Sequence, residues 1–139
     1  MNLNKKEGFT LLEIIIVIII VGVLASLALP RLFKTVEFSR SGEALASFSS
    51  IRSAMERCYL QRGGNYTACT TFSSALDVED PALSPNAHFT YAISSSATTY
   101  AITATRNTVD GGNSGDVIQL FQSTTGVSKS GGGAFSGIN

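Results

Sequence analysis

Glu13 is the side chain of this sequence whose position most clearly invites chemistry. It stands at the head of an apolar run, and no charged residue occurs from Ile14 to Pro30. An ionisable group inside a membrane-spanning segment costs about 3 kcal/mol on insertion scales unless a partner compensates it. We therefore expect Glu13 to be a functional residue that requires a partner group.

Cys58 and Cys69 are the only two cysteines of the chain, and eleven residues separate them. In a domain exported from the cytoplasm, an even pair of cysteines indicates a disulfide. Closing so short a loop would stabilise the fold by roughly 2 to 3 kcal/mol. Two free thiols are the alternative. A metal site is not favoured, because no other cysteine or histidine lies nearby.

His88 is the only histidine, and no serine or cysteine nucleophile is recognisably arranged with it. A structural role for His88 is therefore favoured over catalysis. The sequence also has no nucleotide-binding P-loop motif. The energy for extracting its apolar segment from a membrane must therefore come from another protein. Together these features predict a protein that is not an enzyme and that needs no cofactor.

Two small groups of carboxylates lie in the predicted loops. Either group could offer oxygen ligands to calcium, but neither has the spacing of a standard calcium-binding loop. Solvated loops are therefore the favoured interpretation, and the sequence predicts no metal site. The two groups are Asp77, Glu79 and Asp80 in front of a proline, and Asp110 and Asp116 around a glycine-rich stretch.

The elements that must position these groups begin with one long helix. As a helix, the run from Leu11 to Leu29 would span roughly 28 Å, which nearly matches a bilayer core of about 30 Å. Beyond Pro30 the pattern stays helical to about Arg62 and carries an apolar stripe at i, i+3 and i+4 spacing. Gly63 and Gly64 then provide the left-handed or flexible backbone that ends a helix. The stripe consists of Ala44, Phe48, Ile51, Met55 and Cys58, widened by Leu45 and Tyr59.

The other face of this amphipathic half carries charges that can pair within the helix. Oppositely charged side chains three or four residues apart contribute a few tenths of a kcal/mol each. The candidate pairs are Lys34 with Glu37, Arg40 with Glu43, and Arg52 with Glu56.

Beyond the helix, alternating apolar and polar residues predict antiparallel strands at 89–93, 100–104 and 117–121. A turn at 94–97 connects the first two of these strands. A fourth short strand is expected around 126–130, before a glycine tail at 131–133. The predicted fold class is therefore α+β. A long N-terminal helix, transmembrane in its first half and amphipathic in its second, packs on a small antiparallel sheet.

Length and charge narrow the classes of function. The 139 residues suffice for one small domain beyond the apolar run, and the formal net charge is zero. A neutral chain makes no global electrostatic case for nucleic acid or an anionic membrane as a partner. A local basic patch, and with it DNA binding, stays open.

The stretch Gly8-Phe9-Thr10-Leu11-Leu12-Glu13, followed by apolar residues, resembles the N-terminus of type IV prepilins and of the related pseudopilins. In that family a membrane peptidase cuts after the glycine and N-methylates the new first residue. The resemblance therefore implies cleavage after Gly8 and methylation of Phe9. It also implies that Glu13 neutralises the N-terminal amine of a neighbouring subunit during assembly, and that Pro30 kinks the helix.

The physical chemistry of burial agrees with this pairing. A charged amine on Phe9 would be as costly to bury alone as the carboxylate of Glu13, and pairing the two offsets both costs. The resemblance further implies a division of the chain into four parts. These are a leader at 1–8, a transmembrane and assembly helix at 9–29, an amphipathic helical half at 30–62 and a globular β head at 63–139.

Two other interpretations of the N-terminus compete with this one. An ordinary secretory signal peptide would use Ser26-Leu27-Ala28 as its cleavage site and leave a chain beginning at Leu29. A plain single-pass anchor for an unrelated domain is the second. Against the signal peptide, the apolar run is longer than the usual 7 to 15 residues and carries Glu13 at its head.

The resemblance implies a structural subunit of a type IV pilus-like filament. The alternatives are a pseudopilin of a type II secretion system and a minor pilin that binds surfaces or DNA at the filament tip. The implied partners are other pilin subunits, the prepilin peptidase, an inner-membrane platform protein, an assembly ATPase and, before assembly, the membrane. The implied location is the bacterial inner membrane for the single-pass precursor, and then an extracellular pilus or a periplasmic pseudopilus.

Overall fold

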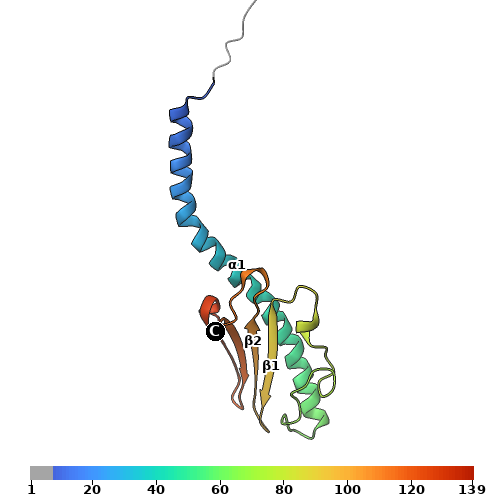
Figure 1. Cartoon of the computed structure of the whole chain (residues 1–139). Coiled ribbons are helices and arrows are strands. Elements are labelled where there is room, and N and C mark those ends of the chain that lie inside the picture. The colour runs from blue at the N-terminus through green and yellow to red at the C-terminus, as the bar shows by residue number, and fades with distance from the viewer. Residues whose placement is uncertain (1–7) are drawn as a thin grey trace, which may run out of the picture. The chain divides into compact units, whose positions relative to one another are not determined.

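A computed structural model describes residues 8–139 and has the α+β architecture (Figure 1). Of the predicted leader at 1–8, only Gly8 lies within the described residues. One long helix precedes four strands and three short 3-10 turns. The elements are α1 (Leu11–Gln61), η1 (Pro81–Leu83), β1 (Phe89–Ser95), β2 (Tyr100–Arg106), η2 (Val109–Gly111), β3 (Val117–Gln122), β4 (Val127–Gly131) and η3 (Gly133–Phe135).

The chain forms two compact units that divide after Thr35. In the first unit the described residues are almost entirely helical, and their large apolar side chains are exposed. This part of α1 is long and apolar enough to cross a membrane, as judged by length and composition. The helix continues through Pro30 without interruption, so the kink at that residue stays a prediction.

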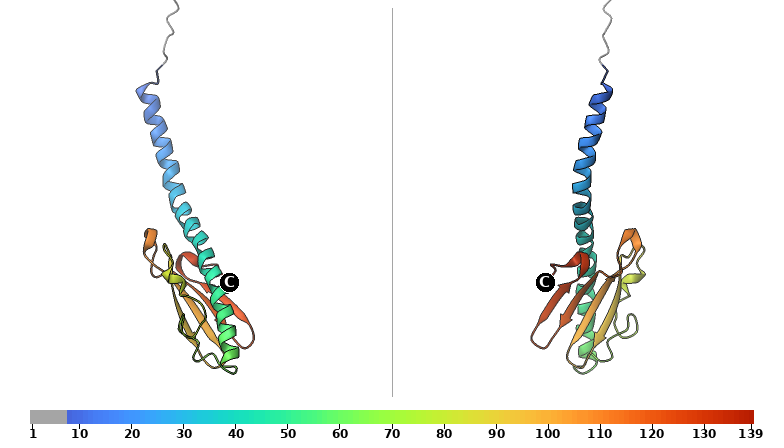
Figure 2. Two further views of the ribbon diagram at one scale, coloured as in Figure 1. Left: turned by 90° about the vertical axis from the view of Figure 1, so that its right-hand side faces the viewer. Right: turned by 60° about the vertical axis from the view of Figure 1, so that its left-hand side comes forward.

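The second unit, residues 36–139, packs the remaining part of α1 on one face of a four-stranded sheet (Figure 2). The strands lie in the order β1-β2-β3-β4, and each pairs antiparallel with the next. All four strands were predicted, and each observed strand begins within one residue of its expected start. Short turns at 96–99 and 123–126 join β1 to β2 and β3 to β4, and a longer loop at 107–116 joins β2 to β3. Strands that follow one another in the chain thus pair as neighbours, as is usual for such connections.

The core lies between α1 and the sheet and uses the predicted apolar stripe. Ala44, Phe48, Ile51, Met55 and Cys58 are all at most 2% exposed, so the predicted stripe is confirmed. Alternate residues of β1, β2 and β3 meet it from the other side. These are Phe89, Tyr100, Ile102, Ala104, Ile118 and Leu120.

The end of α1 also agrees with the sequence. The helix stops at Gln61, and Gly63 and Gly64 adopt φ values of +67° and +86°. The Gly64 N–H donates to the carbonyl oxygen of Tyr59, which satisfies one of the last free carbonyls of the helix. The chain can therefore reverse toward the loop that contains Cys69.

The predicted glycine tail is wrong in one respect. The last residues turn back into the core through η3, where Phe135 is fully buried and Ile138 is 8% exposed. The Phe135 ring packs 5.6 Å from that of Phe89, measured between ring centroids. A Cβ at Gly133 would collide with the carboxylate of Asp116, so this glycine permits the close turn. A spaced pair of apolar residues after three glycines gives no periodic signal, which is why the pattern missed it.

Candidate functional site

The apolar segment of α1 has no cover within its own unit. From Leu11 to Phe33 every large aliphatic or aromatic side chain is at least 41% exposed. A shallow groove of about 720 Å³ runs along this surface and is lined by leucines around Ala28. A helix that is apolar on all sides requires lipid or other helices around it.

The carboxylate of Glu13 is free within the described residues 8–139, where it forms neither an ion pair nor a hydrogen bond. The hydroxyl of Thr10 accepts a hydrogen bond of 3.2 Å from the backbone N–H of Glu13 and so caps the first turn. The reciprocal bond of a capping box, from the Thr10 N–H to the Glu13 carboxylate, is not made in this described part. Phe9 precedes this turn and is 79% exposed. The geometry thus leaves the side chains of Phe9 and Glu13 open to a second molecule.

A disulfide joins Cys58, near the end of α1, to Cys69 in the following loop, with a Cα–Cα distance of 6.1 Å. Both cysteines are at most 2% exposed. Tyr66 lies in the loop between the two cysteines, and its ring packs 4.4 Å from Tyr59 and, edge to face, 4.9 Å from Tyr100 between centroids. Burial among these rings raises the pKa of Tyr100 to about 12. The disulfide therefore holds the helix end against the loop that leads toward the sheet.

A cluster of charged side chains connects α1 to the sheet near residue 36, at the opposite end of the packed part of the helix from Cys58. Arg106, at the end of β2, is fully buried. Its Nε and Nη2 groups donate to the two carboxylate oxygens of Glu37 at 2.9 Å and 3.2 Å. Its remaining hydrogens reach the carbonyl oxygens of His88, Asn107 and Val109 at 2.9 to 3.2 Å. A fully buried guanidinium is tolerated here because its donors are satisfied and its charge is paired.

His88 extends the cluster to a second carboxylate of the helix. Its Nδ1 lies 2.7 Å from Glu43 Oε2, and its Nε2 lies 3.1 Å from Asp110 Oδ2. Its backbone N–H also donates to Glu43 Oε1 at 2.9 Å. Both ring contacts are donated hydrogen bonds only in the imidazolium form, because a neutral imidazole carries one N–H. The predicted structural role of this histidine agrees with these contacts.

Two carboxylates of the cluster, those of Glu37 and Asp110, have pKa values below their usual range. Hydrogen bonds from Arg106 keep the pKa of Glu37 below its usual 4.5, and Arg40, 3.3 Å away, adds to the effect. The hydrogen bond to His88 lowers the pKa of Asp110 below its usual 3.8. Asp110 itself adopts a left-handed backbone conformation with φ of 53°, which aspartate tolerates better than most residues. The glycine-rich loop after β2 is thus fastened to α1 by charge.

The three charge pairs predicted along the helix do not form among the described residues. Glu37 pairs with Arg106 and Arg40, Glu43 pairs with His88, and Glu56 accepts a hydrogen bond from the Tyr66 hydroxyl. The prediction was wrong because partners across the core offered buried, multiple hydrogen bonds that a solvated helix surface does not. Spacing along one helix can find the pair of Glu37 with Arg40, three residues apart, but not the partners across the core.

The two carboxylate groups considered for calcium are used in other ways. Asp77 forms a two-point ion pair with Arg57 at 2.7 Å, and Asp80 caps η1 by accepting from the Ala82 N–H. Within residues 8–139, no three potential metal ligands gather. Glu79 forms no ion pair among the described residues.

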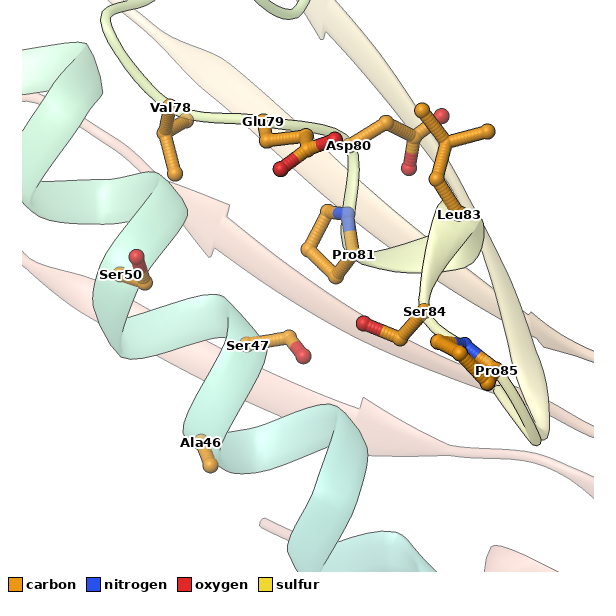
Figure 3. A pocket seen from close by; sticks show the side chains of 10 residues that line it. All are labelled: Ala46, Ser47, Ser50, Val78, Glu79, Asp80, Pro81, Leu83, Ser84 and Pro85. Atoms are coloured by element: carbon orange, nitrogen blue, oxygen red, sulfur yellow. The ribbon is translucent and has the colours of Figure 1, made fainter.

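A groove of about 560 Å³ lies beside Glu79, between α1 and the segment 78–85. In Figure 3 the helical turn that carries Ser47 and Ser50 faces this segment, and Pro81 and Ser84 point toward the helix. Leu83, on the rim, is 70% exposed. The groove therefore combines small side chains on the helix with acidic and apolar ones on the segment opposite.

Two family models match the chain. Residues 31–116 match the family described as "Type IV minor pilin ComP, DNA uptake sequence receptor". Residues 3–29 match the "Prokaryotic N-terminal methylation motif", which includes Gly8, Phe9 and Glu13. Together the two matches extend from residue 3 to the loop before β3.

Curated relatives match part of the chain. The type II secretion system core protein G of Escherichia coli (strain K12) is 37% identical over 82 residues, which cover 59% of this chain and 55% of that protein. The type IV major fimbrial protein FimA of Dichelobacter nodosus is 33% identical over 57 residues, covering 41% of this chain and 36% of that protein. The prepilin peptidase-dependent protein D of Escherichia coli (strain K12) is 32% identical over 62 residues, covering 45% and 42%. The chain thus matches between about a third and just over half of the length of these relatives.

Proposed function

Because the chain belongs to the family of the type IV minor pilin ComP and carries the prokaryotic N-terminal methylation motif, we propose that it is a structural subunit of a type IV pilus-like filament. In this proposal residues 9–29 hold the precursor in the bacterial inner membrane. The same helix then leaves the lipid and packs against those of other subunits, with the β head on the outside. The family consists of structural pilins and pseudopilins.

The uncovered apolar helix is the observation that carries this proposal. Its large side chains, from Leu11 to Phe33, are exposed within their unit. Burying a single side chain of this kind stabilises by about 1.5 to 3 kcal/mol, so the segment gains strongly from either lipid or neighbouring helices. Both environments are provided in turn when a membrane precursor enters a filament core.

Processing sets up the polar contact that selects the filament over the lipid. We propose cleavage after Gly8 and N-methylation of Phe9, which place a positive amine about 6 Å along the helix axis from Glu13. A neighbouring helix displaced along its axis can bring its own amine to this carboxylate. The resulting ion pair offsets the desolvation cost of both charges and fixes the axial stagger between subunits.

Assembly of such a filament requires partners in addition to this chain. They are further pilin subunits, the prepilin peptidase, an inner-membrane platform protein and an assembly ATPase. The proposal also keeps the division of the chain into leader 1–8, assembly helix 9–29, amphipathic half 30–62 and head 63–139. The helical kink at Pro30 belongs to the same proposal and would let the assembly helix follow a curved filament core.

A pseudopilin of a type II secretion system is the second candidate. The match to core protein G of Escherichia coli, at 37% identity over 82 residues, favours it. Overproduction in the native host separates the two roles. Long surface fibres built mainly of this chain support the pilus role, and loss of protein secretion without loss of fibres in a deletion strain supports the pseudopilus.

A DNA receptor at the filament tip is the third candidate, and only the family description favours it. The compact unit of residues 36–139, called the head from here on, comprises the second part of α1 and the β head. It carries eight acidic and six basic side chains, so it is net negative. Arg106 is buried, and Arg40 and Arg57 are engaged in ion pairs. Binding to duplex DNA depends on several cations that neutralise phosphates, and the head has few left for that task.

The decisive experiment combines the intact mass of the mature protein with one substitution. Wild-type chain from sheared fibres should begin at methylated Phe9. Glu13→Gln should be processed in the same way but should yield no fibres, because the neighbour's amine then lacks its countercharge. Ile15→Val in the same helix is the matched control and should form fibres normally. A mature chain that begins at Leu29, or normal fibres from Glu13→Gln, would contradict the proposal.

A further inference from the structure

We propose that the heads of neighbouring copies dock edge to edge, with Lys129 of one copy in the acidic groove beside Glu79 of the next. The inference rests on the proposed filament and adds to it a second contact outside the helical core. The occupant of the groove is thus a second copy of this chain.

The groove and Lys129 lie at opposite edges of the same sheet. η1, on the rim of the groove, packs against β1, and β1 is one edge strand. Lys129 lies on β4, the other edge strand. With strands about 4.8 Å apart, three strand spacings separate the two edges by about 14 Å. The two surfaces cannot meet within one head, but they can meet between heads.

Both surfaces also lie in the layer that contains the helix. Lys129 stands opposite Leu120 in the register of β3 and β4, and Leu120 is buried beneath α1. Cross-strand neighbours point to the same face, so Lys129 is on the helix side of the sheet. The groove is formed by α1 itself and the segment 78–85. A sideways contact between two heads can therefore bring Lys129 of one head to the groove of the next, because both lie on the helix side of the sheet.

The charges of the two edges are complementary and unused. Glu79 and Lys129 are both exposed, and neither forms an ion pair among the described residues. Asp80 uses one carboxylate oxygen for the cap of η1 and leaves the other for an approaching cation. No other lysine lies in residues 36–139.

Exposed apolar side chains accompany the charges at each edge. Leu83 is 70% exposed on the rim of the groove, and Val127 is 37% exposed two residues before Lys129. An apolar contact flanked by an ion pair is the usual composition of a specific interface. Among residues 8–139, no strand pairs with the outer side of β4, and such an edge is available for another chain.

The symmetry of this contact fits a filament. An interface that joins one edge of a head to the opposite edge of the next is heterologous, and a heterologous contact that does not close into a ring continues as a helix. A groove that bound a copy face to face would end at a dimer. The placement of the two surfaces thus favours continuous growth.

Charge reversal tests the proposal in the full-length chain. Lys129→Glu and Glu79→Lys should each lower the yield of sheared fibres at least about tenfold, because like charges then meet at the contact. The double variant should restore most of the yield. Arg62→Glu, which changes an exposed and unpaired arginine by the same charge, is the control and should assemble normally. Unchanged melting temperatures of the detergent-solubilised variants establish that folding is intact.

A second readout reports the contact directly. Leu83→Cys combined with Val127→Cys in one chain should give a ladder of disulfide-linked oligomers in assembled fibres, and each single variant should give none. Wild-type fibre yield from both single reversals, or a double variant no better than the singles, would overturn the edge contact. Fibres that still depend on Glu13 in that case leave the proposed function intact. An absence of fibres from the wild-type chain would instead contradict the proposed function.

Discussion

At the scale of single residues, Arg106 decides how the head is held together. It is a fully buried arginine whose charge is met by a carboxylate from the helix. Such a pair contributes little compared with an apolar substitute, but removing one partner leaves an uncompensated charge in the core. The consequence is that Glu37, although partly exposed, matters more for stability than its surface position suggests.

Glu37→Leu should therefore destabilise the head by about 3 kcal/mol, because Arg106 stays buried without its countercharge. Leucine is as good a helix former as glutamate, so helix propensity does not account for the loss. Urea unfolding of the detergent-solubilised chain, followed by tyrosine fluorescence, measures it. Glu79→Leu serves as the control and should change the free energy of unfolding by less than about 0.5 kcal/mol. Equal effects of the two substitutions would show that the loss of the buried ion pair is not the cause of the destabilisation.

The same residues set the response of the head to acid. Hydrogen bonds from arginines hold the pKa of Glu37 below its usual 4.5 and that of Asp77 below its usual 3.8, and the hydrogen bond to His88 holds the pKa of Asp110 below 3.8. The unfolded chain then binds more protons than the folded one as the pH falls. This stabilisation is complete above about pH 4.5 and is lost as the pH drops through the folded values. Melting temperatures at pH 7, 5, 4 and 3 should fall only across the last steps, and Glu37→Gln with Asp110→Asn should flatten the decline.

At the scale of elements, the helix is attached to the head at two places. The disulfide holds its end at Cys58, and the charged cluster holds it at Glu37 and Glu43. Between them lies the apolar stripe on the sheet. The element is therefore fixed by covalent, ionic and apolar contacts in succession along its length.

Removal of the disulfide should lower the stability of the head by roughly 2 to 3 kcal/mol, because the unfolded chain regains the freedom of a short loop. Cys58→Ala with Cys69→Ala is the variant, and urea unfolding is the measurement. Adding a reductant to the wild-type chain should reproduce the loss, whereas it should leave the double variant unchanged. A reductant that destabilises both chains equally would indicate another cause.

The sequence predicted the regular elements well, because each has a periodic pattern. The stripe from Ala44 to Cys58 repeats with the helix, and Phe89, Tyr91 and Ile93 alternate with the strand. The charged cluster and the buried Phe135 were missed. Each depends on partners far away in the chain, as Glu37 does on Arg106, and no local spacing encodes such a partner.

At the scale of the whole molecule, charge and apolar surface are separated along the chain. The apolar segment carries one carboxylate in about twenty residues, and residues 36–139 carry fourteen charged side chains. The two parts therefore require different surroundings, and only an assembly that offers both satisfies the chain. The candidate site follows the same division, because Glu13 belongs to the first part and the groove to the second.

The net negative charge of the head leads to a prediction about nucleic acid. At 150 mM salt we expect no retardation of duplex DNA by the detergent-solubilised chain at about 10 µM, because too few free cations face solvent to release counterions. A gel-shift titration at two salt concentrations measures this. Glu79→Lys with Asp80→Lys should increase any weak binding and thereby calibrate the assay. Strong retardation by the wild-type chain that weakens steeply with salt would support a receptor role.

The position of the buried ion pair also determines how the head bears mechanical load. Tension applied to the chain ahead of Val36 meets Glu37 and its bonds to Arg106 before it reaches any other part of the helix on the sheet. Those bonds and the neighbouring contacts of Glu43 with His88 must break before the apolar stripe of the helix can leave the sheet. The disulfide lies about 32 Å farther along the helix, at roughly 1.5 Å per residue, and would retain the loop even after such a rupture. A stretched head would therefore yield first at bonds that re-form when the force is released.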